Sequence, residues 1–501
     1  MVTSTLQNPQ VVPLMLGAGA VLVFLSARVL RFGNRRMALL SAAIFGLALH
    51  YVLDNGKLFS RFSFDWAGSW FSIGGSESSS HFNADPGAYL LICIALGSGL
   101  LVSIYSGEYL NLDHRQHAFY PLLMLMLCGL VGFLTTTDLV GLFLFVELMS
   151  ICAYALVAFR RQTDTAIEAG FKYLMMGSTA SILILAGIGF LVLTDGHVHM
   201  NVIRLQPDLI SQLAILLMLC GFCLKCALVP LHTWLPDAHG RAPSSISAIL
   251  SGILVQGVFY GMLRVLLTLG FDSYLLGTIL LPLSFLNIIV GNTLGLVQTR
   301  TKRLLGYSTI AQTGYIVLCV AIGLRNQFPL AIQSAFLILI IHAIAKSLAF
   351  LTKGVLHYYL GVSEIKDLPQ ASRLSLFPTL AFLLALLTLA AIPPFAGFTG
   401  KWVALTSIVA SNDRMGLVSM LILLAGSLLA LGYYFPLMIR LVSQRWISPP
   451  NGGESRILHV SAWMMAPLAV LFLLLLWVSL SPQWVMNLTY EASLFLTGLS
   501  Q

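Results

Sequence analysis

Long runs of hydrophobic residues, separated by short polar segments, follow one another along almost the whole chain. A run of about 17 or more such residues is long enough to cross a bilayer as a helix. Fourteen runs satisfy this length, so we predict fourteen transmembrane helices. They lie near residues 11–30, 37–53, 88–110, 119–137, 138–159, 168–194, 209–235, 243–268, 274–298, 303–324, 329–360, 375–410, 416–441 and 457–480.

The basic residues are distributed unevenly between the loops that connect these runs. The loops that follow even-numbered runs carry few of them, namely Lys57, Arg61, Arg204, Arg325 and Arg414. Cytoplasmic loops of membrane proteins are enriched in lysine and arginine. The asymmetry therefore predicts that both termini lie on the non-cytoplasmic side. The loops that follow odd-numbered runs carry Arg31, Arg35, Arg36, Arg115, Arg160, Arg161, Arg241, Arg300, Lys302, Arg303, Lys366, Arg373, Arg445 and Arg456.

Two of the runs contain prolines that interrupt a continuous helix. In GFCLKCALVPLHTWLPDAHG, residues 221–240, two prolines follow Lys225. In TLAAIPPFAGFTGKWVAL, residues 388–405, two prolines and two glycines precede Lys401. Proline removes a helical hydrogen bond, and matching interruptions in the two halves of a chain are typical of inverted repeats with an ion site at the midplane. We therefore predict broken helices in spans 7 and 12.

These patterns predict an all-α integral membrane protein of about 14 transmembrane helices. Spans 4–8 and 9–13 form two inverted five-helix repeats, each with one broken helix. We expect residues 1–118 to hold the first three helices and a polar loop at 54–87, and residues 442–501 the last helix and a tail. The first repeat takes residues 119–268 and the second takes residues 274–441.

The composition agrees with a membrane location. Of the 501 residues, 58% are hydrophobic and 9% are charged, and the mean hydropathy is +0.90. Soluble domains carry about 25% charged residues, so this chain lacks the polar surface of a soluble protein. The net charge of +8 comes from basic residues in short loops, which membrane topology explains without a nucleic-acid partner.

No redox or nucleotide-binding centre is indicated by the sequence. All seven cysteines lie in apolar runs, which does not suit a disulfide framework. Cys220, Cys223 and Cys226 recur every three residues, but three thiols on one helix without a fourth ligand match neither zinc nor iron–sulfur sites. We interpret them as small packing residues. The chain also lacks a phosphate-binding loop and a dinucleotide-binding fingerprint.

Few ionisable residues lie at membrane depth, and they are spaced through the whole chain. Glu147 lies near the centre of span five, and Lys225 and Lys401 accompany the two interruptions. His342 and Lys346 are four residues apart and therefore share one helix face. Ionisable groups in a membrane interior are costly and usually mark a functional pathway. We predict that these five residues form a functional site.

The residue types in this set suit proton transfer. Burial disfavours a charged lysine and a nearby carboxylate favours it, so a lysine–glutamate pair can switch; histidine titrates near neutrality. Alternatively, Glu147 and Lys225 fix helix register as a structural ion pair, and Lys401 reaches the interface from a helix end. His232 and His239 flank a proline-rich turn, where capping, loop packing and proton access are all open.

Several segments resemble the antiporter-like membrane subunits of respiratory complex I. That superfamily also includes Mrp-type cation/proton antiporter subunits and membrane subunits of group 4 hydrogenases. The resemblance extends from about residue 85 to 440. The segments are FVELMSICAYALVAFRR (145–161), EAGFKYLMMGSTAS (168–181), LVPLHTWLPDAHGRAPSSISAILSG (228–252), TKRLLGYSTIAQTGYIVL (301–318), HAIAKSLAFLTKG (342–354) and IPPFAGFTGKW (392–402).

The resemblance implies a role for each candidate residue. Glu147 and Lys225 match the family's glutamate–lysine pair of spans five and seven. The polar face of span eleven corresponds to His342 and Lys346, and the ionisable residue of broken span twelve to Lys401. At position 256 the chain departs from the pattern, because glutamine stands where many members carry a lysine in span eight. Gln256 can hold water in a polar axis but cannot titrate.

We therefore predict a proton-translocating membrane subunit, of the N or M type, in an NADH- or ferredoxin-driven quinone oxidoreductase. The alternatives are an Mrp-type Na⁺/H⁺ antiporter subunit, a membrane subunit of a group 4 hydrogenase and a non-pumping structural scaffold. The resemblance implies no cofactor in this chain. Quinone, NAD(P)H or ferredoxin, FMN and iron–sulfur clusters are expected in partner subunits, beside other membrane subunits. The expected location is the cell inner membrane or an equivalent energy-transducing membrane.

Overall fold

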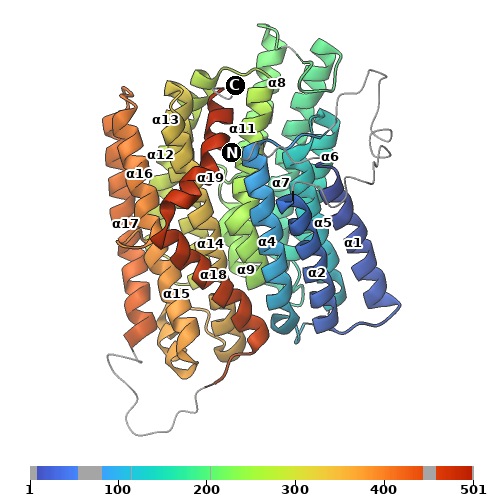
Figure 1. Cartoon of the computed structure of the whole chain (residues 1–501), viewed down its shortest axis with the longest axis vertical. Coiled ribbons are helices and arrows are strands. Elements are labelled where there is room, and N and C mark those ends of the chain that lie inside the picture. Colours follow the sequence, from blue (N-terminus) through green and yellow to red (C-terminus); the bar gives the residue numbers. More distant parts are fainter. Residues whose placement is uncertain (1–7, 55–81, 114, 204, 444–457, 499–501) are drawn as a thin grey trace.

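The computed structural model describes residues 8–54, 82–113, 115–203, 205–443 and 458–498. Helices make up most of these ranges, and the β-structure that they contain consists of isolated bridges between loops. Figure 1 shows α1, α2, α5, α6 and α7 on one side of the molecule and α12, α13, α15, α16 and α17 on the other, with α9, α11, α14, α18 and α19 in the middle. The prediction of an all-α integral membrane protein is confirmed.

The helices of the first half of the chain have the following bounds. They are α1 (Val11–Arg28), α2 (Asn34–Leu53), α4 (Pro86–Tyr109), α5 (Gln116–Thr135), α6 (Leu139–Val157), α7 (Asp164–Asp195), α8 (Leu209–Lys225), α9 (Trp234–Arg241), α10 (Ser244–Ile249), the π-helical turn η2 (Leu250–Leu254) and α11 (Val255–Thr268).

The second half continues with longer helices. They are α12 (Ser273–Leu296), α13 (Thr301–Asn326), α14 (Pro329–Leu360), the 3₁₀ helix η3 (Ile365–Arg373), α15 (Leu376–Leu389), α16 (Ala396–Ala410), α17 (Gly416–Val442), α18 (Ala462–Leu480) and α19 (Pro482–Thr497).

Twelve helical segments in the described part of the chain are long and apolar enough to cross a membrane. One of them, Ser244–Thr268, joins α10, η2 and α11. The shorter apolar helices α8 and α15 begin the two spans for which the sequence predicts interruptions, and both interruptions are present. The count of fourteen spans and the inverted relation between the repeats stay predictions. The helix α19 lies in the segment that the sequence analysis treats as a tail.

Contacts between loops define two ends of the helix bundle. At one end, isolated backbone β-bridges join Arg300 to Glu364 and Leu374 to Leu458, and the Nζ of Lys302 donates to a loop carbonyl. All of these loops follow odd-numbered predicted spans and carry most of the basic residues. We call this the basic end. At the opposite end, bridges pair Phe82 with Thr136 and Asp138 with His199.

Small residues let neighbouring helices approach closely, as is common inside membranes. A Cβ at Gly187 of α7 would lie 2.5 Å from the Cγ of Met218 in α8. A Cβ at Gly291 of α12 would lie 2.6 Å from the backbone nitrogen of Ala311 in α13. The most enclosed spans are Ser244–Thr268, α13 and α14. Polar side chains on these three spans are therefore shielded from lipid.

Candidate functional site

The first interruption separates α8 from α9 and is held by one side chain of α12 and one of α9. The backbone N–H of Val229 donates to Oδ1 of Asn287 at 2.6 Å. The indole N–H of Trp234 donates to the carbonyl of Leu224 at 2.9 Å. Lipid offers no hydrogen bonds, so backbone groups released by a break need such partners. The break leaves Lys225 as the last residue of α8.

The predicted contact between Lys225 and Glu147 is present. The Nζ of Lys225 lies 3.9 Å from Oε1 of Glu147 and donates to Oγ of Ser150 at 2.8 Å. Oε1 of Glu147 also accepts a hydrogen bond from Oγ of Ser181 in α7. The exposed fraction is 5% for the lysine side chain and 27% for the glutamate side chain. The carboxylate thus lies toward the outside of a pair whose ammonium group is enclosed.

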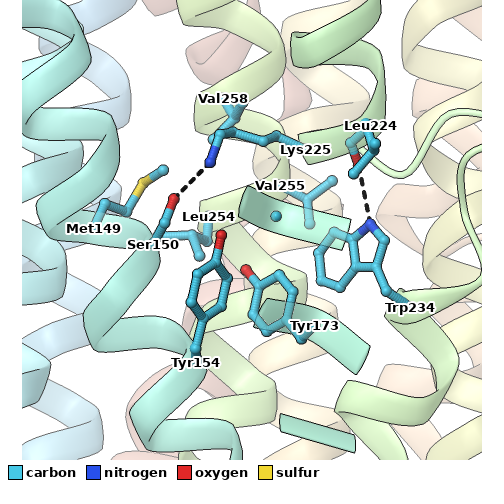
Figure 2. Close-up of a pocket in the computed structure, with 11 residues that line it drawn as sticks. Met149, Ser150, Tyr154, Tyr173, Leu224, Lys225, Trp234, Leu254, Val255 and Val258 are labelled. Carbon is cyan, nitrogen blue, oxygen red and sulfur yellow. Dashed lines mark hydrogen bonds between the residues drawn. The ribbon is translucent and has the colours of Figure 1, made fainter. Parts of the chain in front are cut away.

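A small cavity adjoins this pair. Its wall includes Lys225, Tyr154, Tyr173 and Trp234, together with residues 254, 255 and 258 of η2 and α11. Figure 2 shows the hydroxyl groups of both tyrosines on the side that faces Lys225. Tyr173 and Trp234 stack with ring centroids 4.2 Å apart. The volume that the centre of a water molecule can occupy in this cavity is about 10 Å³, so the cavity has room for about one water molecule.

His342 and Lys346 lie at the centre of the bundle on α14. The exposed fraction is 1% for His342 and 0% for Lys346. Nε2–H of His342 donates to the carbonyl of Ser251 at 3.0 Å, and Nδ1 has no partner in the described residues. Nζ of Lys346 donates to the carbonyl of Leu305 at 2.7 Å and to Oγ of Ser308. Both side chains therefore attach to backbone and hydroxyl oxygens, not to carboxylates.

A polar face of α13 connects these groups, and the sequence analysis missed it. Nε2 of Gln256 donates to Oγ1 of Thr313 at 2.9 Å, and the hydroxyls of Ser251 and Thr309 are 2.7 Å apart. Oε1 of Gln256 is buried and has no partner in the described residues. The spacing of Ser308, Thr309, Gln312 and Thr313 is the signal that identifies this face, because residues four apart share a helix face.

Lys401 follows the second interruption, on α16. Its Nζ donates to Oγ of Ser427 at 3.0 Å and lies 4.1 Å from the ring centroid of Tyr315. The face of an aromatic ring attracts a cation at this distance. Only 7% of the lysine is exposed, so it does not reach the membrane surface. Neither Lys346 nor Lys401 has an ion-pair partner among the residues that the structure describes.

The two interruptions share their local geometry. Each has an alanine in the left-handed conformation shortly after the first helix half, Ala227 with φ of 53° and Ala391 with φ of 57°. Each also forms a hydrogen bond with an amide side chain of the second predicted repeat. Oδ1 of Asn287 accepts from the backbone N–H of Val229 at the first break, and Nε2 of Gln312 donates to the carbonyl of Leu389 at the second break, at 3.2 Å.

His239 is enclosed beside this polar face. It is 0% exposed, and both ring nitrogens lack partners in the described part of the chain. The ring stacks on Phe350, and its Cδ2 would lie 3.5 Å from a Cβ at Gly306. Gly306 lies between Leu305 and Ser308, the two residues that bind Lys346. The ring of His239 caps no helix end, so capping does not explain it.

A buried ion pair at the opposite end was also missed. Arg264 at the end of α11 places Nε 3.0 Å from Oδ2 of Asp85, and the side chains are 8% and 3% exposed. Nη1 of Arg264 also donates to the carbonyl of Thr136 at 2.8 Å. Oδ1 of Asp85 accepts from the Tyr260 hydroxyl and from the Ala88 backbone N–H. The pair fastens α4 to α11, two turns beyond Gln256.

The fold and this interior define a multi-pass membrane protein with charged residues on broken and continuous helices. No group of three or more His, Cys, Asp and Glu side chains in the described ranges is arranged to hold a metal ion. Residues 136–430 match the family described as NADH:quinone oxidoreductase/Mrp antiporter, TM, and the chain belongs to this family. The resemblance seen in the sequence is thereby confirmed.

Two relatives show how far the similarity extends. The chain is 30% identical to NADH-quinone oxidoreductase subunit N of Desulforudis audaxviator. The similarity extends over 483 residues and covers 92% of each chain. It is also 30% identical over 384 residues to F(420)H(2) dehydrogenase subunit N of Methanosarcina mazei, which covers 73% of this chain and 75% of the relative.

Solved structures share the fold at lower identity. The membrane-bound sulfane sulfur reductase, an archaeal respiratory membrane complex, contains a chain with a TM-score of 0.82, 23% identity and coverage of 98% and 97% of the two chains. A chain of the Mrp complex from Dietzia sp. gives a TM-score of 0.80 at 19% identity, with the same coverage. For respiratory complex I from Thermus thermophilus the TM-score is 0.72 at 23% identity, with coverage of 95% and 98%.

Proposed function

We propose that this chain is a proton-translocating membrane subunit of a respiratory-type NADH- or ferredoxin-driven quinone oxidoreductase. The observation that carries the proposal is the line of buried charged and polar groups between Glu147 and Lys401. Family membership supports it, as do relatives named NADH-quinone oxidoreductase subunit N and F(420)H(2) dehydrogenase subunit N.

In this proposal Glu147 and Lys225 form the first switch. A proton on the carboxylate weakens its attraction for the ammonium group, which then releases its own proton toward the cavity at α11. His342 and Lys346 receive protons at the centre, across the polar face of α13. Lys401 is the last titratable group in the line, and Gln256 orders water between the two halves.

His239 gives Lys346 a route to the basic end. Lys302 lies one turn before Gly306 on α13, and its Nζ donates to the carbonyl of Ala242 at 2.6 Å. His239 packs between this turn and Phe350 of α14, with ring nitrogens that can bind water. We assign it the step between Lys346 and Lys302.

The proposal places electron transfer outside this chain. Quinone, NAD(P)H or ferredoxin, FMN and iron–sulfur clusters are assigned to partner subunits. Other membrane subunits are the expected partners, and the printed names of the structural neighbours describe assemblies of several subunits. We assign the complex to the cell inner membrane, with the basic end of this chain in the cytoplasm.

The test is proton uptake by vesicles that contain the assembled complex. Lys346→Met removes the central amine, and Lys172→Met removes an exposed lysine that pairs with Glu168 at the surface. We expect Lys346→Met to lower proton uptake by about tenfold or more, because a positioned acid or base contributes about 10² to 10⁴ in rate. The control should pump normally, with equal assembly confirmed by native gels.

A second arm separates proton pumping from antiport. An imposed sodium gradient, applied without an electron donor, should produce no proton movement. Proton uptake that needs NADH or ferredoxin and a quinone supports the proposal. Sodium-driven exchange without redox substrates favours an Mrp-type antiporter instead, and normal pumping by Lys346→Met contradicts the assigned line.

A further inference from the structure

A pocket of about 320 Å³ opens at the basic end, between the end of α1, the start of α2 and the start of α5. Arg28, Arg31, Gln116 and His117 supply its polar wall, and Phe24 and Phe32 supply part of its apolar wall. None of its lining residues belongs to the proposed proton line.

The polar wall has an excess of positive charge. None of the described residues that line the pocket is acidic. Neither Arg28 nor Arg31 has an ion-pair partner in the described ranges. Gln116 and His117 are the first two residues of α5, where the unpaired N–H groups of a helix carry a partial positive charge. The guanidinium groups make the pocket attractive to an anion even without that helix end.

The apolar wall continues into an exposed apolar stripe on α1. Leu22, Leu25 and Val29 are 52%, 51% and 71% exposed, respectively, and Phe24 at the pocket is 44% exposed. A free phosphate ion would use only the polar wall. A phospholipid would use both surfaces, with its phosphate at the arginines and its acyl chains along α1.

We propose that this pocket binds the phosphate of an anionic glycerophospholipid. The guanidinium groups of Arg28 and Arg31 donate to phosphate oxygens, for which their planar donor geometry is well suited. The cytoplasmic side, to which the proposed function assigns the basic end, is also the side whose anionic lipids attract basic residues. The bound lipid fills the junction between α1, α2 and α5 and ties the first helices to the repeat that begins with α5.

The experiment uses the full-length chain, purified in detergent and stripped of lipid. Phosphatidylglycerol, phosphatidylcholine and inorganic phosphate are titrated separately, and binding is followed by native mass spectrometry and thermal unfolding. The double variant Arg28→Gln/Arg31→Gln should bind phosphatidylglycerol about 30-fold more weakly, at about tenfold per 1.4 kcal/mol and about 1 kcal/mol per basic residue.

Two control variants separate this site from general surface charge. Arg161→Gln/Arg373→Gln removes two exposed arginines from the same end but outside the pocket, and it should bind like the unaltered chain. Arg28→Lys/Arg31→Lys keeps the charge and should retain most of the affinity. The proposal fails if the glutamine pair at the pocket binds normally, if both glutamine pairs lose equal affinity, or if inorganic phosphate stabilises the chain as much as phosphatidylglycerol does.

Discussion

Replacing Lys225 by methionine tests how much its contact with Glu147 contributes to stability and how much it contributes to proton transport. Two unit charges at the observed 3.9 Å attract each other by about 4 kcal/mol at an effective dielectric constant of about 20. Breaking a buried pair typically costs about 3–5 kcal/mol. Because Glu147 is 27% exposed, solvent lowers this cost, and we expect Lys225→Met to reduce the free energy of unfolding by about 2–4 kcal/mol.

The double variant Lys225→Met/Glu147→Gln should recover most of that stability. It leaves no unpaired charge, and the glutamine oxygen can still accept a hydrogen bond from Ser181. Together with the single variant Glu147→Gln it completes a double-mutant cycle, for which the expected coupling free energy is about 2 kcal/mol, within the range for residues in contact. Proton uptake should nevertheless stay as low as in Lys225→Met, since neither replacement titrates.

The assays are denaturant unfolding in detergent and proton uptake in vesicles, on the same preparations. Lys172→Met is the control, because its ion pairs with Glu168 and Asp237 lie at the surface and such pairs contribute about 1 kcal/mol or less each. A double variant that pumps normally would show that the pair is structural. A double variant whose loss of stability equals the sum of the losses in Lys225→Met and Glu147→Gln would show that the two charges are not coupled.

Three further substitutions test other parts of the interior. Gln256→Leu should change the free energy of unfolding by about 1 kcal/mol or less, because it removes one hydrogen bond together with an unpaired oxygen. It should lower proton uptake less than Lys225→Met does, and an equal loss of uptake would contradict the greater importance assigned to Lys225. Arg264→Gln should lower the free energy of unfolding by about 3–5 kcal/mol, because Asp85 stays buried; an unchanged thermal midpoint would refute it. His239→Phe should preserve stacking but slow proton uptake, and normal uptake would remove His239 from the route.

The membrane spans could be predicted because hydropathy acts over whole segments. Prolines also located the two interruptions, since proline cannot continue the helical hydrogen bonds. The helix α19 escaped prediction because its sequence PQWVMNLTYEASLFLT mixes polar residues into a run of 16 residues, below the length of a typical span. The closure of each break by Asn287 or Gln312 depends on helices distant in sequence, which periodicity does not reveal.

The charged site residues could be found because a single lysine or glutamate is conspicuous in an apolar run. Isolated hydroxyl partners could not, because serine and threonine are common in membrane helices and only packing decides which of them meets a charged group. Ser150, for example, binds Lys225 from 75 positions away. Arg264 was missed for another reason: at the end of an apolar run, an arginine that reaches the interface gives the same sequence pattern.

The glutamine at position 256 determines how the proposed line must work at its centre. Between Lys225 and His342 the structure offers a cavity for about one water, then Gln256, Thr313, Thr309 and Ser251, none of which titrates near neutral pH. A proton cannot rest on any of these groups, so it must cross this stretch along ordered water and hydroxyls in one event. The unpaired Oε1 of Gln256 is the acceptor that can orient such a water. A proton then passes between Lys225 in the first half and Lys346 in the second half only when one of them is protonated and the other is neutral. This requirement is the gate of the proposed translocation.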